Sequence, residues 1–307
     1  MTPPAAADSA RPSLPAASRS RSGALPAAPA RRWGLSKVGL YAAVTAISAF
    51  FLFPIYLIFL LAFEPTNYSI LAARPTLIPI HLTLQNLQTG LSNPSLPFVS
   101  SMYLSLEIAF IVGAIAIAIG IPTAYGLSRL TPGLAYGLTT VMFIVNMLPS
   151  ITIAIPITVP FIKAGLYGSP ISIALTQELL ALPVTVFLLV GAFQGLPRDL
   201  ESQARVDGAG RLRAIYGSLV PLIRPALVAS FLLAWMLSWD ESTFALILYN
   251  PANPTLPVSI FLAVTGRGGN PQVGIAFSFL ATIPVIILTV LLQKYLKGED
   301  LAAGVRG

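Results

Sequence analysis

Long apolar segments alternate with short polar ones along most of this chain. A helix needs about 20 apolar residues to cross the roughly 30 Å of hydrocarbon in a bilayer. Segments of that length predict six membrane-spanning helices, at 38–63, 104–127, 138–162, 170–193, 225–249 and 272–293. The predicted fold class is therefore an all-α integral membrane protein, with one transmembrane domain over 36–307.

The third segment is interrupted by Pro149, Pro156 and Pro160. Each proline leaves a backbone carbonyl without its helical partner, and in lipid that carbonyl must be satisfied by a neighbouring helix or by water. We expect this span to be kinked, or split with a re-entrant part.

Residues 1–35 are rich in Ala, Pro, Ser and Arg and hold few large apolar side chains. Such a segment buries too little surface to offset its ordering entropy, so it is predicted to be a disordered cytoplasmic tail. A cleaved signal peptide is the alternative, but the apolar run that follows has full spanning length and lacks a small-residue cleavage site.

The overall composition supports a membrane protein and argues against an enzyme. Hydrophobic residues make up 55% of the chain and charged residues 9%, with a mean hydropathy of +0.80. The net charge of +7 does not indicate nucleic acid binding, because the basic residues lie between apolar runs. The chain has no cysteine, and its single histidine, His81, lies in a Pro-rich loop without a second ligand nearby, so we predict no catalytic residues and no metal site.

The distribution of Lys and Arg predicts the orientation. Of the 18 basic residues, all but three fall on one side of the predicted spans if the N-terminus is inside. The three exceptions are Arg74, Lys163 and Arg267. We therefore expect a multi-pass protein of the cell inner membrane with both termini in the cytoplasm. The polar loop, residues 194–223, then shares the compartment that contains ATP.

The first half of the polar loop has the pattern of a short capped helix. Pro197 suits a first helical turn, Asp199 and Glu201 suit the positive end of the helix dipole, and Arg205 suits the negative end. Gly208 is predicted to end this helix in the left-handed conformation.

A second helix is predicted after Gly208, and Pro221 marks the turn into the fifth span. Its apolar residues recur at helical spacing and predict one apolar face: Leu212, Ile215, Tyr216, Leu219 and Val220. Two short helices of this kind form either a knob for a soluble partner or an interfacial element on lipid headgroups.

Four carboxylates are predicted within or near the apolar spans: Glu107, Glu178, Asp240 and Glu241. An ionised carboxylate there is costly unless it faces water, a partner or a cavity, so these residues are candidates for a translocation path or a subunit interface. The alternative is that neighbouring helices satisfy them. Trp235 and Trp239 offer faces for sugar stacking, or pack within the bundle. Residues 250–271 are rich in Pro and Gly and predict an external loop.

The run Leu196-Pro-Arg-Asp-Leu-Glu-Ser-Gln-Ala-Arg-Val-Asp-Gly-Ala209, followed by Leu219-Val-Pro221, resembles the EAA loop of binding-protein-dependent ABC importer permeases. Ser202 and Gln203 stand where that pattern has Glu and Ala, whereas Glu201 keeps the acid that often precedes them. The resemblance implies a coupling helix that seats in a cleft of an ATPase subunit. The residues it assigns to ATPase coupling are Glu201, Ala204, Arg205, Asp207, Gly208, Ala209 and Pro221.

Three further stretches resemble the carbohydrate-import group of the maltose MalG type. They are Ala124-Tyr-Gly-Leu-Ser-Arg129, Ser238-Trp-Asp-Glu-Ser-Thr-Phe-Ala-Leu246 and Leu301-Ala-Ala-Gly-Val-Arg-Gly307. The resemblance implies a type I importer permease that forms half of a path for a di- or oligosaccharide. Within the second stretch, Trp239, Asp240 and Glu241 are the candidates for the path or for the contact with another subunit.

The expected partners follow from the missing phosphate loop and from the resemblance. It has no Gly-x-x-x-x-Gly-Lys-Ser/Thr phosphate loop, so ATP and Mg are expected in a partner ATPase and no cofactor is expected here. The resemblance implies a second permease subunit in a heterodimer, two copies of the ATPase subunit and an extracytoplasmic solute-binding protein, with lipid around the spans. The main alternative is an ion-coupled secondary transporter that uses the intramembrane carboxylates. An intramembrane serine protease is excluded, since His81 lies outside the spans and no Ser-Lys pair shares one.

Overall fold

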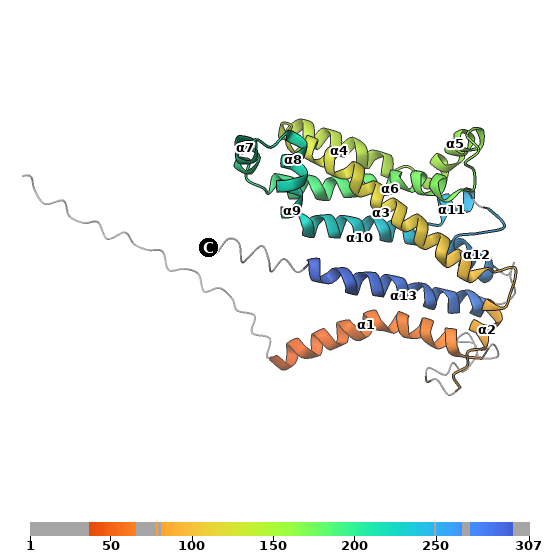
Figure 1. The fold of residues 1–307 in the computed structure, drawn as a ribbon. Helices are drawn as coiled ribbons and strands as arrows, with labels where there is room; N and C mark the ends of the chain where they lie inside the picture. Colours follow the sequence, from red (N-terminus) through yellow and green to blue (C-terminus); the bar gives the residue numbers. More distant parts are fainter. Residues whose placement is uncertain (1–36, 66–77, 79–80, 249, 266–270, 297–307) are drawn as a thin grey trace, which may run out of the picture. The chain divides into compact units, whose positions relative to one another are not determined.

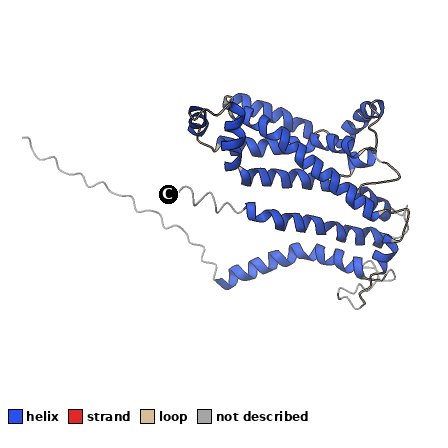
Figure 2. Ribbon diagram, viewed as in Figure 1, coloured by secondary structure: helices blue, strands red, loops and turns tan. Residues whose placement is uncertain are grey.

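The computed structural model describes residues 37–65, 78, 81–248, 250–265 and 271–296. Within these ranges the regular secondary structure is entirely helical (Figure 2), which confirms the all-α prediction. The chain divides into two units, Met1–Phe51 and Leu52–Gly307, and the packing described below lies within the second. The predicted tail, 1–35, and the terminal stretch, 301–307, lie outside the described residues.

Figure 1 labels most of these helices along the chain. Their bounds are α1 Lys37–Phe63, α2 Gln85–Leu91, α3 Phe98–Ser128, α4 Pro132–Asn146, α5 Ser150–Lys163, α6 Pro170–Gln194, α7 Asp199–Val206, α8 Arg211–Ala214, the π-helical turn η1 Ile215–Leu219, α9 Val220–Leu222, α10 Arg224–Asp240, α11 Thr243–Ile247, α12 Leu256–Val264 and α13 Pro271–Leu296.

Four of the described helices, α1, α3, α6 and α13, are each long and apolar enough to cross a bilayer. The number rises to six if each of two bent pairs counts as one span: α4 with α5, bent by 89°, and Arg211–Leu222 with α10, bent by 83°. Each of the six predicted segments corresponds to one of these helices or pairs. The bend between α4 and α5 falls inside the third predicted segment, whereas the bend before α10 precedes the fifth.

The break in the third segment falls at residues 147–149. Pro149 precedes α5 with extended backbone angles, φ −55° and ψ 127°. Proline disfavours helical angles at the residue before it and donates no backbone hydrogen bond, so α4 ends there. The predicted split is therefore present, whereas Pro156 and Pro160 lie inside α5 without ending it.

The fifth segment is shorter than predicted. Its helix, α10, ends at Asp240 and not at residue 249, because Glu241 has extended backbone angles and its side chain binds the start of α11. The residue at 249 lies outside the described ranges.

Helices α3, α6 and α10 pack against one another and form the centre of the bundle. Glycines allow the close approach: a Cβ on Gly113 of α3 would lie 2.6 Å from the Phe231 ring of α10, and one on Gly120 would lie 2.9 Å from Thr185 Cγ2 of α6. Small residues at helix contacts are typical of membrane bundles, where packing rather than the hydrophobic effect joins the helices.

Part of the predicted external loop, 250–271, folds back into the bundle as α12. Leu256, Val258 and Ala263 of this helix are buried. Ser105 of α3 accepts a hydrogen bond from the backbone N–H of Leu256 at 2.8 Å. The prediction of a loop is therefore wrong for Leu256–Val264, which is helical because its apolar residues pack on α3 and α13.

Candidate functional site

The polar loop begins with α7, and its helix ends as the sequence predicted. Gly208 has φ +83°, in the left-handed region. Two hydrogen bonds close the turn, from Ala209 N–H to the Ala204 carbonyl at 3.0 Å and from Gly208 N–H to the Arg205 carbonyl at 3.1 Å. This pair of bonds defines a Schellman motif, which satisfies carbonyls at the end of a helix.

The second half of the polar loop runs through α8, η1 and α9. Ile215 and Leu219 are buried, whereas Leu212 is 72% exposed and Tyr216 is also exposed. The prediction of one apolar face is therefore wrong in part. A π-helical turn bonds residue i to i+5 and holds an extra residue, so positions at α-helical spacing no longer share a face.

The two most exposed large apolar side chains of the polar loop are Val206 and Leu212. Val206, at the end of α7, is 87% exposed, and Leu212 lies on α8. Neither belongs to the seven residues assigned to ATPase coupling. Three of those seven are exposed: Arg205, Asp207 and Gly208. Three more are half-buried: Ala204, Ala209 and Pro221.

Glu201, the remaining residue of that set, points into its own subunit. Its carboxylate accepts a hydrogen bond from the Tyr125 hydroxyl at 2.6 Å and pairs with Arg129 Nη2 at 3.0 Å. The guanidinium carbons of Arg129 and Arg211 lie 5.1 and 5.7 Å from the centre of the Tyr125 ring. The sequence marked Tyr125 and Arg129 only as part of a family-like stretch, and the structure brings that stretch to the polar loop.

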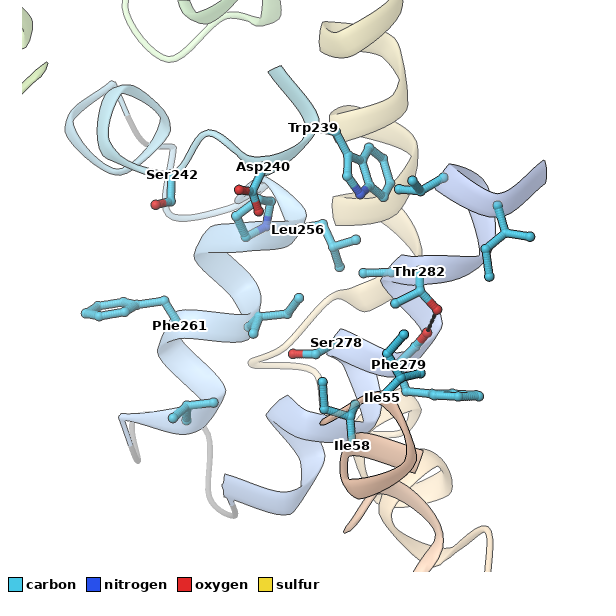
Figure 3. Close-up of a pocket in the computed structure, with 16 residues that line it drawn as sticks. Ile55, Ile58, Trp239, Asp240, Ser242, Leu256, Phe261, Ser278, Phe279 and Thr282 are labelled. Carbon is cyan, nitrogen blue, oxygen red and sulfur yellow. Dashed lines mark hydrogen bonds between the residues drawn. The ribbon is translucent and has the colours of Figure 1, made fainter. Parts of the chain in front are cut away.

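At the far end of α10, Asp240 lines two hollows. One is a cavity of about 730 Å³ between α10, α12, α13 and the second half of α1, and the other has a volume of about 460 Å³. Figure 3 shows Trp239 and Asp240 on one side of the larger cavity and Ser278 of α13 on another. The larger cavity is lined mainly by aliphatic and aromatic side chains, so Asp240 is an exposed carboxylate in apolar surroundings.

The two tryptophans of α10 stack on each other, with ring centres 5.1 Å apart and planes 10° apart. Trp235 is buried, and Trp239 is 8% exposed and lines both hollows. Trp235 is thus a packing residue. Trp239 packs on one side and borders the cavities on the other.

Glu241 has a local structural role. Its carboxylate accepts hydrogen bonds from the backbone N–H groups of Thr243, Phe244 and Ala245 at 2.7 to 3.3 Å, which satisfies the start of α11. It also accepts a hydrogen bond from Gln177 Nε2 of α6 at 3.3 Å. The contact with Gln177 was not anticipated, since nothing in the local pattern connects residues 64 positions apart.

The other two carboxylates lie in different surroundings. Glu107 is exposed on α3. Glu178 of α6 is only 5% exposed, and neither of its carboxylate oxygens has a hydrogen-bond partner among the described residues. The structure therefore does not gather the four predicted carboxylates into one cluster. Within the described ranges, no three His, Asp or Glu side chains lie close enough to hold a metal ion.

Apolar helices of spanning length, two bent helix pairs and a folded polar loop define an integral membrane protein. Comparison with known proteins gives the family. The chain belongs to the binding-protein-dependent transport system inner membrane components, whose family model matches residues 116–297. This membership confirms the predicted permease class, a transport subunit and not an enzyme.

Two relatives and one solved structure illustrate the similarity. The sulfoquinovosyl glycerol transport system permease protein SmoH of Agrobacterium fabrum is 32% identical over 234 residues, 76% of this chain and 81% of that protein. The trehalose/maltose transport system permease protein MalG of Thermococcus litoralis is 29% identical over 240 residues, 75% and 84% of the two chains. A chain in the crystal structure of a bacterial ABC transporter involved in the import of the polysaccharide alginate has the same fold, with a TM-score of 0.66, 19% identity and coverage of 85% and 96%.

Proposed function

We propose that this chain is a permease subunit of an ATP-driven importer for a di- or oligosaccharide, and that the polar loop couples it to a partner ATPase. The observation that carries the proposal is the shape of the loop: a closed helix end beside two strongly exposed apolar side chains, Val206 and Leu212. Exposed apolar side chains of this kind favour a protein partner. The sugar assignment is supported by the names of SmoH and MalG.

In this proposal the ATPase contact is the outer surface of the polar loop. Val206 and Leu212 supply the apolar area, and Arg205 and Asp207 supply charge at its edge. Gly208, with Ala204, Ala209 and Pro221, gives the loop its shape. Two ATPase copies, which bind ATP and Mg, then act on this chain and on a second permease subunit, and a binding protein delivers the solute at the opposite end.

The orientation proposed is that the polar loop faces the cytoplasm, as do both termini. The basic residues support it, since Arg129, Arg198, Arg211 and Arg224 all lie in or next to the polar loop. Because the chain has no cysteine, one introduced thiol reports its side of the membrane. A thiol at the exposed residue 203 (Gln203→Cys) is expected to react with a membrane-impermeant maleimide only in inside-out vesicles. Labelling of intact cells would contradict this orientation.

The proposed path borders Asp240. Helix α10 has 17 residues, so Asp240 lies about 25 Å along the helix from the polar loop, most of the way across the hydrocarbon. An exposed carboxylate at that depth needs water or a partner subunit. We place Asp240 and Trp239 at the path or at the interface with the second permease subunit, whereas Glu241 supports the backbone there. Glu107 and Glu178 have no assigned part in this mechanism.

One observation favours a second candidate, an ion-coupled secondary transporter: Glu178 is buried in a spanning helix without a hydrogen-bond partner among the described residues. Such a carboxyl group is the kind that binds a coupling ion.

The deciding experiment uses vesicles containing the permease pair with and without the ATPase subunit, with radiolabelled trehalose and maltose as probes. ATP-dependent uptake that persists with an ionophore supports the importer. Ionophore-sensitive uptake without the ATPase supports the alternative. A complex that fails to retain the ATPase subunit on purification argues against the proposal whichever sugar is carried.

A further inference from the structure

We infer that Glu201 is a positioning residue that fastens the polar loop to α3, and that the loop and the adjoining ends of α3 and α6 move as one rigid body. The role of this movement in coupling to an ATPase rests on the proposed function. The contacts that carry it lie inside this chain and do not depend on a partner.

The polar loop is joined covalently to α6 at one end and to α10 at the other. The pairings of Glu201 add a third attachment, to α3, although Glu201 and Tyr125 are 76 positions apart in the sequence. Tyr125 is buried at the centre of this attachment: Arg129 and Arg211 lie against its ring, and its hydroxyl donates to Glu201. We call these four residues the Tyr125 clamp. The clamp joins α3, α7 and α8 through one aromatic ring.

Charge and burial both strengthen the clamp. The side chains of Arg129 and Glu201 are only 19% and 18% exposed, so water screens their ion pair less than it would at an open surface. The hydrogen bond from Tyr125 has an ionised acceptor, which makes it stronger than a neutral one. Both favourable contacts depend on the carboxylate of Glu201.

Apolar packing holds the second half of the loop to the same two helices. Ile215, Leu219 and Ile223 are buried in a cluster with Ile121 and Tyr125 of α3 and with Val186, Leu189 and Phe193 of α6. The chain then turns by 83° into α10, with prolines on either side of the turn at positions 221 and 225. The loop is therefore fastened to α3 and α6, while a sharp bend separates it from most of α10.

This arrangement assigns Glu201 a role different from that of its neighbours in the coupling set. Its carboxylate is occupied within the subunit, so it does not serve as a free charge for the ATPase. Because Glu201 ties α7 to α3, a displacement of α7 by the ATPase also moves α3. Without this tie, only the loop would move.

The first test uses the purified chain and hydrogen exchange of backbone amides in 199–206. Glu201→Gln removes the ion pair, and Tyr125→Phe removes the hydroxyl donor but keeps the ring. The double variant is expected to exchange about tenfold faster in this segment, a factor that corresponds to about 1.4 kcal/mol. Two variants serve as controls. Asp199→Asn on the same helix removes an exposed acid near the helix start and is expected to exchange only about 2- to 5-fold faster. Tyr136→Phe at an exposed site on α4 is expected to match the unchanged chain.

Exchange in 199–206 that is no faster in the double variant than in Asp199→Asn overturns the clamp. Faster exchange across α3 and α6 as well would show general unfolding, and it too counts against a local attachment. Because no ATPase is present, this test stands even if the proposed function fails.

The second test asks whether the clamp transmits movement, using the complex with both permease subunits, the ATPase and the binding protein in nanodiscs. In Glu201→Gln with Tyr125→Phe, the ATPase subunit is expected to co-purify with unchanged basal ATP hydrolysis, while stimulation by the binding protein is lost. A merely structural defect would lower basal hydrolysis or co-purification instead. Full stimulation in the double variant overturns the inference, whereas failure of the unchanged chain to retain the ATPase contradicts the proposed function.

Discussion

Replacing Gly208 by alanine tests how the polar loop is built. Gly208 has φ +83°, and an L-residue in the left-handed region costs about 1–2 kcal/mol relative to glycine. A Cβ at this position would meet no atom within 4 Å, so no steric clash adds to that cost. The whole penalty therefore falls on the turn that ends α7.

Trypsin measures this penalty, because Arg205 and Arg211 flank the turn and the peptide bond after Arg205 lies within it. When opening is fast relative to cleavage, the cleavage rate follows the population of the open loop. A change of 1–2 kcal/mol alters that population by about 5- to 30-fold. The Gly208→Ala chain is thus expected to be cut after Arg205 about 5- to 30-fold faster than the unchanged chain.

Two variants control the comparison. Gly210→Ala makes the same chemical change two residues away. The φ of Gly210 is −63°, which alanine adopts readily, and an added Cβ there also meets no atom within 4 Å. This variant is therefore expected to be cut no faster than the unchanged chain. Gly208→Asn should lie between alanine and glycine, since asparagine tolerates the left-handed region. Equal cleavage of Gly208→Ala and Gly210→Ala would refute the reasoning, because it would mean that α7 does not end in a left-handed turn.

Two further predictions concern stability, each read as the thermal midpoint of the detergent-purified chain followed by tryptophan fluorescence. Gly113→Ala places a Cβ 2.6 Å from the Phe231 ring and is expected to destabilise the bundle by about 1–3 kcal/mol, whereas Gly137→Ala, where the added carbon meets nothing within 4 Å, should not lower the midpoint. Glu241→Ala removes the acceptor for the start of α11 and is expected to cost about 0.5–2 kcal/mol, while Asp240→Ala at the exposed neighbouring position should cost less. Similar midpoints for Gly113→Ala and Gly137→Ala, or for the two acidic variants, would contradict the packing and capping described here.

Helix ends that depend on local backbone conformation are readable from the sequence, whereas those that depend on distant side chains are not. The ends of α7 and α4 were predictable because a positive-φ glycine and a proline act on their own backbone, at Gly208 and Pro149. The apolar segments were predictable for a similar reason, since the length and hydropathy of a helix are properties of contiguous residues. The end of α10 was not predicted, because Glu241 caps α11 through its side chain. Nothing in the neighbouring sequence identifies this glutamate as a capping residue.

By itself, therefore, the sequence determined the helical class, the approximate spans, the split third segment and the capped helix of the polar loop, all of which depend on interactions within a few residues. Only the tertiary structure decided that Glu201 meets Tyr125, that Leu212 faces outward while Ile215 faces inward, and that α12 returns to the bundle. These outcomes depend on which helices pack side by side, and the free energy of such contacts belongs to residues far apart in the chain. No local sequence pattern predicts these contacts.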